Sequence, residues 1–176
     1  MICEKYPHQF IFVGRLERVK SIDVLVKVWS RLGRKRKDWE LVVIGSGSLE
    51  KELLGLKAVK HFQFQQPEQL SRHLEMAGCF VLPSRKEPWG VVIHEHAAAG
   101  LPLICSDACG AAETFLISSM NGYSYPADDH LALENRMLRI INSPDYKLIE
   151  MSKSSHQIGQ RIAASTSAAN LLSILE

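Results

Sequence analysis

The 176-residue sequence contains no apolar run near the roughly 18 residues that a membrane span requires. Its first eight residues are polar and lack the apolar stretch of a secretory signal peptide. Net charge is low, because 21 basic residues nearly balance 19 acidic ones, and so charge alone indicates neither a nucleic acid nor a membrane as partner. Internal repeats, low-complexity tracts and linkers are absent too. With 46% hydrophobic residues, the sequence predicts one globular domain over residues 1–176.

Cysteine is scarce, and the four cysteines show no C-x-x-C spacing of the kind found in metal or redox sites. Cys79 and Cys105 fall within apolar, strand-like runs, and the other two are Cys3 and Cys109. Buried, reduced thiols explain this pattern better than disulfides do. We therefore expect a cytoplasmic protein.

What the sequence does contain is a repeated switch between short apolar runs and helical periodicity. The apolar runs predict strands at 10–13, 41–44, 61–64, 80–82, 103–105 and 122–125. The helical patterns predict helices at 22–33, 49–56, 67–76, 91–99 and 111–117, and further helices from 128 onward, broken by Pro144 with Gly159 as a second candidate break. This alternation predicts an α/β fold: a Rossmann-like, doubly wound parallel sheet of about six strands with helices on both faces. Ligands bind such sheets beyond the carboxyl ends of the strands.

Two of the strand-to-helix loops carry candidate phosphate ligands. Arg15 and Lys20 follow the first strand, where Gly14 lets a ligand approach the backbone, and together they suit a diphosphate. The alternative is that both cations are solvated loop residues. After the second strand, Gly45-Ser46-Gly47 offers either a phosphate loop or a plain tight turn, because Glu50 leaves the G-x-G-x-x-G fingerprint incomplete.

A third loop, residues 83–90, precedes the helix that begins after Gly90 and combines an anion-binding helix start with two carboxylates. Glu87 lies in the loop, and Glu95 lies eight residues further along the chain, inside the helix. A carboxylate that faces a crevice can accept hydrogen bonds from the vicinal hydroxyls of a sugar or ribose. The apolar neighbours of Glu95 predict that this helix is mostly buried and that its carboxylate is not simply solvent-exposed.

The spacing Glu87-x7-Glu95, within P-S-R-K-E-P-W-G-V-V-I-H-E-H-A-A-A-G-L-P, resembles the signature of the group 1 family of retaining GT-B glycosyltransferases. Four more segments resemble motifs of that family in the same order: V-G-R-L-E-R-V-K, L-V-V-I-G-S-G, C-G-A-A-E and N-G-Y-S-Y-P-A-D. The resemblance runs from about residue 10 to the C terminus. It implies the C-terminal, donor-binding half of a GT-B fold.

The resemblance implies a nucleotide diphosphate sugar as donor substrate, a UDP or GDP sugar rather than an ADP sugar, with no cofactor and no metal. Arg15 and Lys20 would hold the diphosphate beside Gly14, and Glu87 would contact the transferred sugar. Backbone amides at the helix start would lie near that sugar and its phosphate. These amides would come from Trp89, Gly90, Val91 and Val92. Glu95 would accept hydrogen bonds from the ribose, and the base would lie against Phe64 and Gln65.

The sequence departs from the family pattern at five positions. Ser21 stands where glycine usually follows the phosphate lysine, and Pro88 removes one N–H donor from the third loop. Gln63, His96 and Cys109 replace small residues. These departures affect the expected identity of the base and the contacts to the sugar more than they affect phosphate binding.

Two further features have ordinary interpretations. His94-Glu95-His96 is not a zinc helix, because residues two apart project to different faces and H-E-x-x-H is missing. The basic run at 31–37 contains no aromatic residue, and a solvated helix end explains it better than a nucleic-acid patch. We therefore expect no nucleic-acid partner.

Family members have a second, N-terminal domain that holds the acceptor. Only about eight residues precede the first predicted strand, too few for that domain. We therefore expect the chain to be part of a longer protein and to be inactive alone. That longer protein could contact the inner face of the membrane. Two alternatives stay open: a sugar-nucleotide 2-epimerase of GT-B fold, and a non-enzymatic nucleotide-sugar-binding module.

Overall fold

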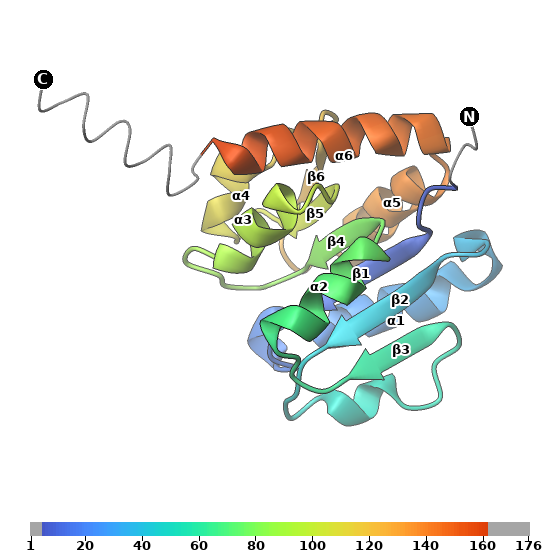
Figure 1. Cartoon of the computed structure of the whole chain (residues 1–176). Helices are drawn as coiled ribbons and strands as arrows, with labels where there is room; N and C mark the ends of the chain where they lie inside the picture. Colours follow the sequence, from blue (N-terminus) through green and yellow to red (C-terminus); the bar gives the residue numbers. More distant parts are fainter. Residues whose placement is uncertain (1–4, 162–176) are drawn as a thin grey trace, which may run out of the picture.

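The computed structural model describes residues 5–161, which form one parallel six-stranded sheet with helices on both faces (Figure 1). The strands are β1 (Gln9–Val13), β2 (Glu40–Ile44), β3 (Val59–Phe62), β4 (Cys79–Leu82), β5 (Leu103–Ser106) and β6 (Gly122–Tyr125). Their order across the sheet is β3-β2-β1-β4-β5-β6, and every pair of neighbours is parallel. The predicted Rossmann-like, doubly wound sheet is confirmed.

The helices are α1 (Ile22–Leu32), α2 (Pro67–Glu75), α3 (Val91–Ala98), α4 (Gly110–Phe115), α5 (His130–Ile141) and α6 (Asp145–Gln160). Three short 3-10 turns accompany them: η1 (Arg18–Lys20), η2 (Gly33–Arg36) and η3 (Glu50–Leu53). On one face α1 packs against α5, and on the other α3 packs against α4 and α6 (Figure 1). No helix in this part of the chain combines the length and apolarity needed to cross a membrane.

The four central strands explain why the sequence shows continuous apolar runs instead of alternation. β1, β2, β4 and β5 are buried along nearly their whole length, because helices cover both faces of the sheet. Cys79, Cys105 and Cys109 are buried free thiols, as predicted, and burial raises the pKa of each. Cys3 lies outside the described residues.

The structure corrects the sequence reading at three places. β3 lies two residues earlier than predicted, because this edge strand is only partly buried and its apolar pattern is weak. The helix predicted at 49–56 is reduced to the single turn η3. Gly159 does not break a helix. It lies inside α6, where a Cβ would come within 2.3 Å of the Ala98 backbone nitrogen, so glycine allows α6 to pack closely on α3.

The sheet reverses its winding direction between β1 and β4, which are hydrogen-bonded neighbours. From β1 the chain moves outward to β2 and β3, whereas from β4 it moves the other way to β5 and β6. The loops at the carboxyl ends of β1 and β4 therefore diverge and leave room between them. In open α/β sheets this is the place where ligands bind.

Candidate functional site

The loop after β1 is fixed at its base and presents one cation outward. Gly14 N donates to Ile44 O at 3.0 Å, and Leu16 N donates to Ser46 O at 2.9 Å. Leu16 is fully buried and anchors the loop, whereas the neighbouring Arg15 is exposed. The loop thus projects Arg15 from a rigid base at the carboxyl edge of the sheet.

The glycines after β2 serve the packing of this loop. A Cβ on Gly45 would lie 2.0 Å from the carbonyl oxygen of Gly14, and one on Gly47 would lie 2.5 Å from that of Leu16. Both contacts are impossible for real side chains, so only glycine fits at either position. This close packing accounts for both glycines without a bound phosphate and favours the tight-turn interpretation.

Lys20 and Glu87 meet across the diverging loops of β1 and β4, and their side chains form an ion pair. Their exposed fractions are only 17% and 14%, so the pair is partly shielded from water. The alternative that Lys20 is a solvated loop residue is wrong, because its side chain is largely shielded and paired. Lys20 ends the turn η1, which brings its side chain over the loop that carries Glu87.

Backbone hydrogen bonds hold the loop around Glu87 on both sides. Glu87 N donates to Ala108 O at 3.1 Å, and Gly110 N donates to Glu87 O at 3.0 Å. The loop of residues 83–90 is therefore bonded to the chain that enters α4. Glu87 is an ordered part of the carboxyl edge, even though it belongs to no strand.

The helix α3 begins directly after this loop, at Val91, with Gly90 as its N-cap. Gly90 has φ +91°, a left-handed conformation that glycine adopts without strain. The first amides of a helix have no partner within the helix, so the N–H groups of Val91 and Val92 are available to an anion. Trp89, just before the cap, is half-exposed.

Glu95 is exposed, contrary to the expectation that its helix buries it. The buried positions of α3 are Ile93, His96 and Ala97, which form one stripe toward the sheet. Val91 and Glu95, one turn apart, lie on the opposite side. The apolar composition predicted that most of the helix, including Glu95, is buried, but the helix buries only one stripe of its surface.

Two adjoining cavities lie along the carboxyl edge. The first, about 370 Å³, is lined by Gly14 and Arg15 together with the ends of β1 and β2. The second, about 360 Å³, is lined by Glu95 and residues of α2. Phe64, Gln65 and Leu70 line both cavities. The structure therefore brings all three residues expected at the base and the ribose to one continuous surface, and the Lys20–Glu87 pair is not among the residues that line it.

The sequence profile described as "Glycosyl transferases group 1" matches residues 4–162. The chain belongs to this family. It is 27% identical over 147 residues to an uncharacterized glycosyltransferase of Haemophilus influenzae. This alignment covers 81% of this chain and 42% of the relative. It is 30% identical over 145 residues to a glycogen synthase of Mycobacterium tuberculosis, covering 78% of this chain and 35% of the relative.

Solved structures of other glycosyltransferases share the fold. The pneumococcal O-GlcNAc transferase GtfA, solved in complex with UDP and GlcNAc, matches 97% of this chain with a TM-score of 0.82 and 21% identity over 35% of its own length. The lipopolysaccharide outer core galactosyltransferase WaaB matches 96% of this chain with a TM-score of 0.80 and 22% identity over 48% of its own length. The group 1 chain has the fold of the C-terminal domain of a GT-B enzyme, and it spans less than half the length of these relatives.

Arg85 is a residue of this group 1 domain that sequence reasoning missed. Its guanidinium donates to both carboxylate oxygens of Asp23 at 2.9 and 3.2 Å, and its Nε lies 2.7 Å from Asp128. Its backbone N donates to Val19 O at 2.9 Å. Burial alone would raise the pKa of Asp23, but the hydrogen bonds and charge of Arg85 outweigh this effect and lower it. Arg85 thereby joins the Lys20 loop to the Glu87 loop, a contact that no spacing in the sequence reveals.

The two histidines of α3 make separate contacts, as expected for residues two apart. His94 stacks on Phe115 with ring centroids 4.4 Å apart, and its Nε2 lies 2.9 Å from Gly159 O. His96 is fully buried, stacks on Phe80 at 3.9 Å, and bonds to its own helix. Burial lowers the pKa of His96 to about 4. Among residues 5–161, no three His, Cys, Asp or Glu side chains are grouped in a way that could hold a metal ion.

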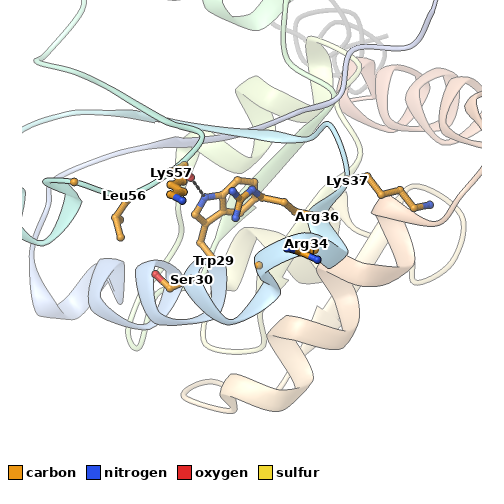
Figure 2. A pocket seen from close by; sticks show the side chains of 9 residues that line it. Trp29, Ser30, Arg34, Arg36, Lys37, Leu56 and Lys57 are labelled. Atoms are coloured by element: carbon orange, nitrogen blue, oxygen red, sulfur yellow. Dashed lines mark hydrogen bonds between the residues drawn. The ribbon is translucent and has the colours of Figure 1, made fainter.

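A third cavity, about 570 Å³, lies at the amino end of the strands, between the end of α1 and the chain that enters β3 (Figure 2). Trp29 is one of the residues that line it and donates from Nε1 to Lys57 O at 3.1 Å (Figure 2). The Arg36 guanidinium lies over the Trp29 ring, 5.6 Å from its centroid. The bond to Lys57 satisfies the Trp29 N–H within the protein, and the cavity is remote from the β1–β4 switch point.

Proposed function

We propose that this domain binds a nucleotide diphosphate sugar at the carboxyl edge of its sheet and takes part in retaining transfer of the sugar to an acceptor. The observation that carries the proposal is the convergence of Lys20, Glu87 and the N-terminus of α3 at the β1–β4 switch point. A cation, a carboxylate and free helix amides at this place suit a ligand with both phosphate and hydroxyl groups.

The phosphates would be held by Lys20 and Arg15, with Gly14 permitting close approach of the ligand. When the sugar leaves the nucleotide, negative charge develops on the diphosphate. Fixed cations and helix amides that face this charge lower the barrier, because they need not reorganise during the reaction. We propose that these groups suffice and that the reaction needs neither a divalent metal nor a cofactor.

The remaining residues would orient the donor. Glu87 would accept hydrogen bonds from the transferred sugar, and Glu95 would accept them from the ribose hydroxyls. The exposure of Glu95 supports this role, because an exposed carboxylate that lines a cavity is accessible to a ligand. The base would lie against Phe64 and Gln65, which line both cavities along the edge.

Transfer would require a second domain to hold the acceptor. The matched glycosyltransferases are more than twice as long as the segment that aligns with this chain. Positioning the acceptor hydroxyl beside the anomeric carbon supplies much of the rate in such reactions. We therefore propose that residues 1–176 bind the donor alone but transfer its sugar only together with an acceptor-binding domain.

Calorimetry and thermal unfolding of the chain with UDP, GDP, ADP and inorganic pyrophosphate test the proposal. We expect binding of UDP or GDP in preference to ADP, and about 2.7 kcal/mol of stabilisation at 100 times the dissociation constant. In Glu95→Gln, UDP should bind about fivefold more weakly while pyrophosphate is unaffected, because only UDP carries a ribose. Absence of binding for every nucleotide at millimolar concentration would refute the proposal.

A further inference from the structure

Two groups that are proposed to contact different parts of the donor contact each other in the structure. Lys20 is assigned to the diphosphate and Glu87 to the sugar, yet their side chains form a partly buried ion pair. Lys20 N donates to Glu17 O at 2.9 Å, and Glu87 is bonded through its backbone to Ala108 and Gly110. Both backbones are therefore fixed, and the pair depends only on the positions of two long side chains.

The Glu87 side chain also lies against the start of α3. A Cβ on Gly90 would come within 2.8 Å of Glu87 Cγ and 3.5 Å of its Cδ. The carboxylate thus lies between the Lys20 ammonium and the helix cap. A cation together with a helix N-terminus is the environment that a phosphate group prefers. In the structure, the carboxylate of Glu87 occupies that environment.

We propose that Glu87 is an internal competitor of the donor phosphate: it neutralises Lys20 in the empty site, and donor binding displaces it toward the sugar hydroxyls. This inference rests on the proposed function. An anion that lacks a sugar, such as pyrophosphate, must break the Lys20–Glu87 pair and leaves the carboxylate without a partner. A complete donor offers the displaced carboxylate new hydrogen-bond donors. The site thereby discriminates against simple anions and couples sugar binding to phosphate binding.

Other charges do not replace either partner. Arg85, on the same loop as Glu87, is bonded to Asp23 and Asp128. Glu17, near Lys20 in sequence, accepts hydrogen bonds from the backbone N and hydroxyl of Ser48 at 2.9 and 2.6 Å. Removing the charge of Glu17 therefore changes the charge of the same loop without breaking the Lys20–Glu87 pair, which makes it a matched control.

The test measures the dissociation constant of inorganic pyrophosphate by calorimetry for the wild type, Glu87→Gln and Glu17→Gln. We expect Glu87→Gln to bind pyrophosphate about tenfold more tightly, since the strength of a partly buried pair lies between those of exposed and buried pairs. Glu17→Gln should change the constant less than twofold. A Glu87→Ala variant, checked by thermal unfolding, gives the same comparison if the glutamine variant does not fold.

A double-mutant cycle with Lys20→Ala separates this competition from a general effect of charge. Without Lys20, Glu87→Gln should no longer tighten pyrophosphate binding, because the two effects act through one pair. Equal or weaker binding by both Glu87 variants, with normal binding by the wild type, would overturn the inference and leave the proposed function intact. Absence of binding by wild type and variants alike would instead overturn the proposed function, and the inference with it.

Discussion

The carboxyl and amino ends of the sheet both carry cavities beside basic side chains, but they hold these side chains differently. At the carboxyl end, Lys20 is 17% exposed, ends a 3-10 turn and pairs with Glu87. At the amino end, Arg31 and Lys35 pair with Glu134, but the cavity-lining side chains of Arg34 and Lys57 form no ion pair within residues 5–161. The first arrangement positions a charge, whereas the second leaves charges in solvent.

The direction of the helices explains this difference. In a parallel α/β sheet, helix N-termini lie at the carboxyl ends of the strands and helix C-termini at the amino ends. Helix N-termini attract anions, so a ligand with phosphates belongs at the carboxyl end. Basic residues at the end of α1 instead stabilise the C-terminal pole of that helix. Cations at the two ends of the sheet therefore have different roles.

The largest effect is expected from adding a methyl group to the carboxyl-end loops. Gly45→Ala places a Cβ 2.0 Å from the Gly14 carbonyl oxygen at φ +138°, whereas Gly33→Ala, at the amino end with φ +49°, meets nothing within 4 Å. We expect Gly45→Ala to lower the free energy of unfolding by more than about 3 kcal/mol and Gly33→Ala by about 1 kcal/mol. Urea unfolding measures both, and equal losses would contradict the close packing of the two loops.

A second expected effect concerns pH. Because the pKa of buried His96 is about 4, it lies below the ordinary value of about 6.5 that the unfolded chain has. As pH falls, the unfolded state therefore binds a proton at His96 before the folded state does. The contribution of neutral His96 to the free energy of unfolding is complete above pH 7 and is lost between about pH 6.5 and 4. The loss should reach about 3 kcal/mol.

His96→Leu, which keeps the stacking volume near Phe80 but cannot titrate, should remove most of this loss. The measurement is the free energy of unfolding by urea at several pH values from 7.5 to 4.5. The same pH dependence in the wild type and the variant would show that other groups cause it.

Ligand binding gives the most direct test of the two ends. Lys20→Ala should weaken UDP binding about tenfold to hundredfold, because a charge-assisted contact with phosphate is lost. The loss should shrink as salt is raised. Arg34→Ala, an equal change of charge at the amino end, should change UDP affinity less than twofold. Calorimetry at two salt concentrations measures the UDP affinity of both variants. Similar losses of affinity in the two would indicate a nonspecific effect of net charge.

The sequence predicts the fold well because the central strands are buried on both faces and therefore appear as continuous apolar runs. It predicts β3 less well, since an edge strand such as Val59–Phe62 has a mixed burial pattern and no sharp limits. The alternation of strands and helices predicts a doubly wound parallel sheet but not the order of its strands, because such sheets occur with more than one order.

The candidate site is only partly predictable, for geometric reasons. Spacing identifies Glu87 and Glu95 but cannot show that Glu95 faces outward, because this depends on which stripe of α3 meets the sheet. Neither the Lys20–Glu87 pair nor the Arg85 clamp on Asp23 follows from spacing. Both join residues more than 60 positions apart in the chain, and only the folded loops bring them together.

The smallest expected effect tests whether the loop after β1 is strained at Ser21. Ser21, directly after Lys20, has φ 53° and ψ 35°, a left-handed conformation that costs a residue with a Cβ roughly 1 kcal/mol. Its hydroxyl is buried and has no hydrogen-bond partner among the described residues. Ser21→Gly removes both defects but adds conformational freedom to the unfolded chain, so we expect the free energy of unfolding to rise by about 1 kcal/mol.

Ser21→Ala removes the hydroxyl alone, which separates the two causes. If Ser21→Gly lowers the urea midpoint, the hydroxyl has a partner in solution and the strain argument fails; if both variants raise it equally, the unpaired hydroxyl is the whole cause.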